Sequence, residues 1–140
     1  MNNENRQHCI SIAETLEKIA NGQMYRCPEC GEYITEEQLF DAESAYVCPC
    51  CKAEEIDSDD CEQVNFFDHF QDVLDVEYRL NAERQFKSVK LLVAFGGPNI
   101  WVDTGSCEVI LRWWTESASC PIDPEACEAI NSCFEELFNC

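Results

Sequence analysis

The 140-residue sequence lacks any apolar run close to the roughly 20 residues that a membrane-spanning helix needs. Its first residues, Met1 to Arg6, are polar and lead into no apolar stretch, so we expect no secretory signal. Only two histidines are present, and no glycine-rich phosphate loop, nucleophile elbow or H-E-x-x-H pair occurs. These absences argue against a membrane protein and favour a protein that is not an enzyme.

Basic residues are also scarce. Nine lysines and arginines stand against 28 aspartates and glutamates, which gives a formal net charge of -19. Such a charge repels phosphates, so direct binding to nucleic acid is disfavoured and a basic protein partner is favoured. Acidic residues also confer solubility, and composition alone does not separate the two explanations.

Cysteine, by contrast, is abundant, with 12 residues. Because we expect an intracellular protein, reduced thiols are favoured over a secreted disulfide scaffold. Two C-x2-C pairs, Cys27/Cys30 and Cys48/Cys51, are separated by 17 residues. Such pairs supply four thiolates in the tetrahedral arrangement that structural zinc prefers. The sequence therefore predicts one structural Zn²⁺ ion in a zinc ribbon, with rubredoxin-like iron as the chemical alternative.

The remaining cysteines have no metal-ligand spacing among themselves. We expect most of them to pack as small apolar side chains. A second metal pair of Cys61 and His69 is an alternative, but a partly exposed histidine on an amphipathic helix is the favoured interpretation. The cysteines left without a predicted role beyond packing are Cys61, Cys107, Cys120, Cys127, Cys133 and Cys140.

Periodicity divides the chain into an N-terminal helix (1–22), the zinc ribbon (23–56) and an α+β domain (57–140). The first helix is predicted over residues 4–20. A second helix is expected after the acidic residues 57–60. Its inner face is predicted to carry Phe66, Phe67, Phe70, Val73 and Leu74.

Strands alternate with turn signals in the second half of the chain. The turns are Gly96–Asn99 and Asp103–Ser106, which favour an antiparallel meander. The strands are predicted over residues 76–80, 86–95, 100–102 and 107–114. Asp123 as N-cap and Pro124 begin a final helix. Its apolar face is predicted to carry Cys127, Ile130, Cys133, Phe134, Leu137 and Phe138. We therefore expect an α+β fold in which a small antiparallel β-sheet packs against a C-terminal helix, with an N-terminal helix and a zinc-ribbon module.

The turn Asp103-Thr104-Gly105-Ser106 matches the local pattern of aspartic proteases, in which two aspartates share a proton. A single copy would require a homodimer. The sequence has no later apolar strand and small-residue turn to support such an aspartate. A structural hairpin turn is the favoured interpretation, and a dimeric protease using Asp103 is the weakest of the functional hypotheses.

Acidic residues concentrate in the ribbon, its linker and the final helix, and no lysine or arginine follows Arg112. A rigid row of carboxylates can imitate the charge pattern of a nucleic acid and occupy a basic cleft. The candidate partner-binding residues are Glu36, Glu37, Asp57, Asp59, Asp60, Glu125, Glu128, Glu135 and Glu136.

The C-terminal half of the sequence resembles small proteins of phages and mobile elements in Gram-positive bacteria. The residues that carry this resemblance are Asp75 to Tyr78, Gly96 to Thr104, the pair Trp113-Trp114 and the acidic final helix. Some proteins of that setting are anti-CRISPRs. The resemblance implies a cytoplasmic inhibitor in the bacterial host cell. It would block guide or target DNA loading of a type II CRISPR effector nuclease, by acting as a DNA mimic or by holding one conformation. A zinc-ribbon adaptor acting on transcription or on another defence system is the second hypothesis.

Overall fold

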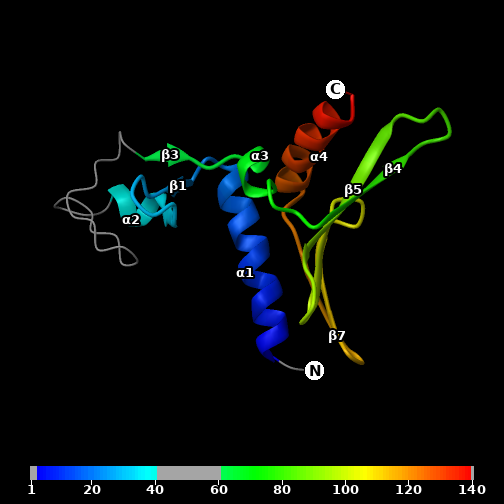
Figure 1. Ribbon diagram of the computed structural model, residues 1–140, viewed down its shortest axis with the longest axis horizontal. Coiled ribbons are helices and arrows are strands. Elements are labelled where there is room, and N and C mark those ends of the chain that lie inside the picture. Colours follow the sequence, from blue (N-terminus) through cyan, green and yellow to red (C-terminus); the bar gives the residue numbers. More distant parts are fainter. Residues whose placement is uncertain (1–2, 41–60, 140) are drawn as a thin grey trace.

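The computed structural model describes residues 3–40 and 61–139, and this part of the chain has an α+β architecture (Figure 1). The larger sheet is an antiparallel meander in which the strands follow one another in sequence order. Its strands are β4 (Asp75–Leu80), β5 (Phe86–Ala94), β6 (Asn99–Asp103), β7 (Glu108–Trp113) and β8 (Glu116–Pro121). The predicted meander is confirmed.

A smaller antiparallel sheet lies to one side of the larger one, in the order β2-β1-β3 (Figure 1). Its strands are β1 (Met24–Arg26), β2 (Tyr33–Thr35) and β3 (Glu62–Gln63). The helices are α1 (Asn3–Ala20), α2 (Glu36–Phe40), α3 (Phe66–His69) and α4 (Pro124–Phe138).

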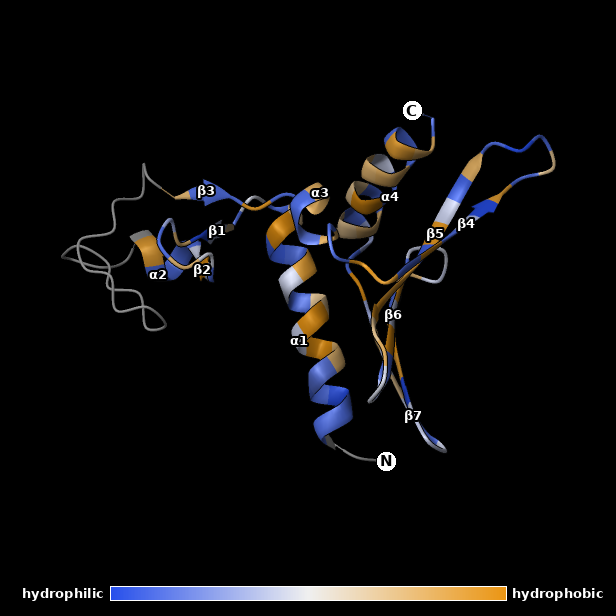
Figure 2. Ribbon diagram, in the orientation of Figure 1, coloured by the Kyte–Doolittle hydropathy of each residue, from blue (hydrophilic) through white to orange (hydrophobic). Residues whose placement is uncertain are grey.

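The main core forms where α1 and α4 cover one face of the larger sheet, and Figure 2 shows apolar residues along both helices and the strands. Successive side chains of a strand point to opposite faces, so only alternate residues enter the core. The core-facing residues of the three central strands have at most 1% of their surface exposed, and they are Val89, Leu91, Ile100, Val102, Val109 and Leu111. Residues between them, such as Trp101 and Ile110, stay partly exposed on the opposite face.

Both terminal helices follow the predicted periodicity. In α1 the buried side chains are Cys9, Ala13, Leu16 and Ile19. In α4 they are Ala126, Cys127, Ile130, Cys133 and Phe134. Asp123 occupies the N-cap position, but its side chain makes no capping hydrogen bond. Leu137 is 47% exposed and does not belong to the buried face, whereas Phe138 at the end of the helix packs against the rings of Tyr78 and Phe86.

The predicted helix after residue 60 is wrong in length. Asn65 caps α3 by accepting a hydrogen bond from the Asp68 amide at 2.9 Å, but the helix ends after a single turn. The amide of Leu74 instead donates to the Leu92 carbonyl at 2.9 Å, which leads the chain into the sheet. Phe67 and Leu74 are therefore 43% and 59% exposed rather than part of an inner face.

Candidate functional site

The first predicted cysteine pair lies in the tight loop between β1 and β2. The Cys27 amide donates to the Glu32 carbonyl at 2.8 Å, and the Gly31 amide donates to the Cys27 carbonyl at 2.9 Å. Gly31 has a φ of 79°, a left-handed conformation that glycine adopts without strain. Of the two cysteines, Cys27 is buried and Cys30 is exposed. This loop has the backbone turn that a C-x2-C metal knuckle requires.

A further cysteine, Cys61, immediately precedes β3. The register pairs Arg26 with Glu62, and extending it by one pair brings Cys61 opposite Cys27. Both belong to a small apolar cluster with Ile34 and Leu39, separate from the main core. The His69 ring nitrogen Nδ1 is hydrogen-bonded to the Tyr33 hydroxyl at 2.7 Å, and the alternative pairing of Cys61 with His69 stays a prediction.

The second predicted pair, Cys48 and Cys51, lies outside the described residues. Within residues 3–40 and 61–139, no group of three or more histidine, cysteine or acidic side chains is arranged to hold a metal ion. The described half of the predicted ligand set fits thiolate coordination by its loop geometry. The four-cysteine zinc ribbon remains a prediction.

Asp103 forms the most elaborate polar contact in the described structure. Arg79 donates from Nη1 and Nη2 to the two carboxylate oxygens, at 2.7 and 2.9 Å. The amides of Gly105 and Ser106 donate to Oδ1 at 2.9 and 3.3 Å. Burial acts to raise the pKa of Asp103, but these hydrogen bonds and the charge of Arg79 outweigh it, so that the pKa lies below its usual value.

The neighbouring Thr104 joins the same turn to the final helix. Its hydroxyl accepts a hydrogen bond from the Val89 amide at 3.0 Å, and Asn131 Oδ1 lies 2.6 Å away as an acceptor. Thr104 is buried, so these bonds fix the turn against both β5 and α4. Asp103 and Thr104 thus have complete structural roles in a hairpin turn, which is what the favoured interpretation of the motif predicts.

The acidic side chains of α4 lie on its solvent side. Glu125, Glu128, Glu135 and Glu136 are all exposed, opposite the buried stripe of that helix. No basic residue occurs in the last turn of α4, so Glu135 and Glu136 add to the negative end of the helix dipole. This surface is rigid, because Ile130 and Phe134 fix the helix to the core.

The other predicted acidic residues do not join this surface. Glu36 is half-buried and Glu37 is exposed, and both lie in the first turn of α2, beside the small sheet (Figure 1). Asp57, Asp59 and Asp60 lie outside the described residues. The structure therefore separates α2 and α4 into two acidic regions.

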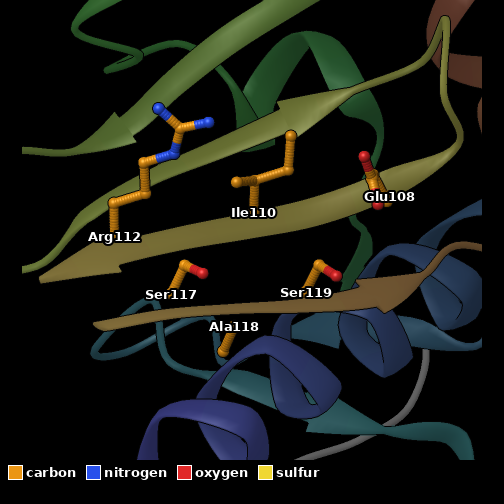
Figure 3. Close-up of a pocket in the computed structure, with 6 residues that line it drawn as sticks. All are labelled: Glu108, Ile110, Arg112, Ser117, Ala118 and Ser119. Carbon is orange, nitrogen blue, oxygen red and sulfur yellow. The ribbon is translucent and has the colours of Figure 1, made fainter. Parts of the chain in front are cut away.

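The open face of the larger sheet carries a shallow hollow of ≈ 230 Å³ over β7 and β8 (Figure 3). Arg112 and Glu108 lie at its two ends, with Ile110 between them and the hydroxyls of Ser117 and Ser119 along one side. On the neighbouring strand, the Trp101 ring lies 5.1 Å from the Lys90 ammonium, near enough for a cation–π contact. The hollow has no cluster of groups suited to catalysis.

Exposed aromatic side chains gather at one end of this sheet, a feature that sequence reasoning missed. Trp114 is 86% exposed and Phe95, in the adjacent β5–β6 turn, is 72% exposed. Trp114 also has a φ of 57°, which is unusual for a bulky residue. The dipeptide Trp113-Trp114 was visible in the sequence, but its position in a two-residue hairpin turn was not, because β8 was not predicted.

A mainly apolar cavity of ≈ 240 Å³ lies between α1, α3 and the ends of β5 and β6. His8 and His69 both line it, with Ile12, Leu16 and Phe70 among the apolar residues. Burial and the charge of Arg26 lower the pKa of His69, so its imidazole is neutral near pH 7.

Two cysteines that are far apart in sequence meet in the main core. Burial and a hydrogen bond with the Cys107 thiol raise the pKa of Cys127 to about 12. At neutral pH this thiol is protonated, and a protonated thiol is a poor nucleophile. Cys127 is buried in the core, and the partly buried Cys107 packs against it.

No protein-family model, no curated protein and no solved structure matches the chain. In the part of the chain that the structure describes, no helix has the length and apolar character needed to cross a bilayer.

Proposed function

We propose that this protein is a non-enzymatic inhibitor that binds a basic surface of a nucleic-acid-handling enzyme. More specifically, we propose an anti-CRISPR that blocks guide or target DNA loading of a type II CRISPR effector nuclease. The observation that carries the proposal is the solvent side of α4, where four glutamates are exposed on one rigid helix that has no basic residue in its last turn.

The dimensions of this surface suit a basic nucleic-acid channel. An α-helix rises about 1.5 Å per residue, so Glu125 and Glu136 are about 16 Å apart along the axis. That length corresponds to about five nucleotide steps of one DNA strand. Fixed carboxylates over this distance accelerate the encounter with a basic cleft and compete with phosphates for it.

We also propose that one structural Zn²⁺ ion is bound by Cys27, Cys30, Cys48 and Cys51. The described loop supports this through the burial of Cys27 and the left-handed turn at Gly31. A site with four thiolates has no open coordination position, so zinc there would stabilise the small sheet and would not take part in catalysis.

The zinc-ribbon adaptor is the second candidate function, because the first knuckle is joined to a three-stranded sheet. An adaptor would use α2 and the knuckle as its binding surface. The protease hypothesis has less support, because a general acid–base aspartate needs an accessible carboxylate and that of Asp103 is engaged by Arg79 and two amides.

A cleavage assay with a purified type II effector nuclease, its guide RNA and a target DNA tests the main proposal. The parent protein should protect the target when it is added before the guide or the DNA. Replacing Glu125, Glu128, Glu135 and Glu136 with glutamine keeps their size and should abolish protection. A control variant replaces two glutamates that are exposed on α1, Glu14 and Glu17, with glutamine and should protect like the parent. Failure of the parent to protect the DNA from a panel of such nucleases would exclude the anti-CRISPR function.

A further inference from the structure

An apolar groove of ≈ 260 Å³ lies between α3 and the solvent side of α4. Phe66 and Phe67 line it from α3, and Ala129 and Cys133 line it from α4. Glu136 lies at its rim. The groove therefore joins an apolar surface to the acidic face of the same helix.

The floor of this groove is rigid. Phe66 is buried and its ring lies 5.8 Å from that of Phe70, in a stacked arrangement. Phe70 in turn lies 5.8 Å from Phe134 of α4. Phe67, which adjoins Phe66 in the sequence, is 43% exposed and has no comparable burial. A partner side chain would meet a preformed apolar surface and would cover Phe67, without first rearranging the core.

The electrostatics of the rim favour a cation. Glu135 and Glu136 lie in the last turn of α4, where the helix dipole is also negative, and that turn contains no basic residue. Burial, together with the charge of Glu136, raises the pKa of Cys133 to about 11, so the carboxylate acts on the groove itself. A cationic group bound here would relieve the repulsion among these charges.

We propose that the groove binds a basic, amphipathic helical segment of a protein partner. One large apolar side chain of that segment lies against Phe67 and Ala129, and a lysine or arginine one turn away pairs with Glu136. A nucleic acid would be repelled by the same carboxylates, and a second copy of a chain with a net charge of -19 would be repelled as well. This inference deepens the proposed function by naming the chemistry of the partner segment.

A synthetic peptide of about 18 residues, long enough to form a helix, provides a probe that does not depend on the nuclease. One version carries leucines on one face and lysines on the other, and the second carries the same lysines with serine in place of leucine. Titration into the ¹⁵N-labelled full-length protein should shift the amides of Ala129, Ser132 and Cys133. The leucine-containing peptide should bind about tenfold more tightly than the serine version.

Two variants test the position of the site. Ala129→Phe fills the groove and should lower the affinity for the leucine-containing peptide about tenfold, while the affinity for the serine version stays unchanged. Ser11→Phe adds the same side chain at an exposed position of α1 and should have no effect. Glu136→Gln, which does not alter packing, should weaken the leucine-containing peptide about threefold. Circular dichroism confirms that each variant is folded.

Equal affinity of the two peptides, or equal binding by the parent, Ala129→Phe and Glu136→Gln proteins, would overturn the inference. The inference would also be overturned if zwitterionic lipid vesicles, or self-association of the protein, changed the chemical shifts of the groove amides more than the peptide does. If the peptide discriminates as expected but no nuclease is inhibited, the proposed function fails while the groove assignment stands.

Discussion

Gly105 lies where a methyl group would collide with the ion pair between Arg79 and Asp103. A Cβ atom built on Gly105 would be 2.5 Å from Arg79 Nη1, 3.0 Å from Ser88 Oγ and 3.2 Å from Asp103 Oδ1. The nearest of these atoms is the end of a flexible side chain that is 37% exposed. We therefore expect Gly105→Ala to displace the guanidinium rather than the strands.

The size of the effect depends on how much of the ion pair the methyl group would break. Exposed ion pairs contribute up to about 1 kcal/mol, and breaking a buried pair costs about 3–5 kcal/mol. Asp103 is almost fully buried, Arg79 is not, and the amides of Gly105 and Ser106 still bond the carboxylate. Alanine also lowers the conformational entropy of the unfolded chain, and this stabilisation of about 0.4–1 kcal/mol offsets part of the loss from the weakened ion pair. We expect Gly105→Ala to lower the free energy of unfolding by about 1 kcal/mol.

Urea unfolding followed by circular dichroism measures this change, and a double-mutant cycle assigns it. In an Arg79→Met background the guanidinium is absent, so Gly105→Ala should be neutral or slightly stabilising. The coupling energy between the two positions should be about 1 kcal/mol. An equal loss of stability in both backgrounds would show that the methyl group clashes elsewhere, and the explanation of the turn would be refuted.

Three further predictions concern other contacts. The pKa of His69 lies below 6.5 in the folded protein, so the unfolded chain binds a proton at this histidine first as the pH falls. The free energy of unfolding should therefore decrease as the pH drops below about 6.5, and unfolding of the His69→Gln variant, measured against pH, should lack that decrease. Purified protein should contain one zinc ion per chain by metal analysis, Cys27→Ser should lose it, and parent protein without stoichiometric zinc or iron would contradict the ribbon. Thr104→Val should destabilise the fold by about 1–3 kcal/mol, since it leaves the Val89 amide and Asn131 Oδ1 without this partner; a change below about 0.5 kcal/mol in urea unfolding would contradict that role.

The sequence predicted the elements that have strong local signals. The apolar stripe containing Leu16 and the turn at Gly96, which has a φ of 94°, specify α1 and the β5–β6 connection. Strand β8 was missed because its residues are mostly small and polar, and only Ala118 and Cys120 among them are buried or partly buried. Its assignment depends on pairing with β7, which no local pattern reveals.

The same limit applies to the candidate sites. The helical spacing of Glu125, Glu128, Glu135 and Glu136 correctly predicted their exposure. The partner of Asp103 lies 24 residues away in sequence, and the register that brings Cys61 opposite Cys27 joins segments more than 30 residues apart. Such contacts depend on tertiary packing, so charge and motif patterns in one sequence do not predict them.

The glutamates of α4 are proposed to bind a basic enzyme surface. Calorimetric titration of the guide-free type II nuclease with the parent protein measures this binding directly, at low and at high salt. We predict a stoichiometric complex that weakens with salt and is lost when Glu125, Glu128, Glu135 and Glu136 are changed to glutamine, but not when Glu14 and Glu17 are. A complex of unchanged affinity with the four-glutamine variant would contradict the account.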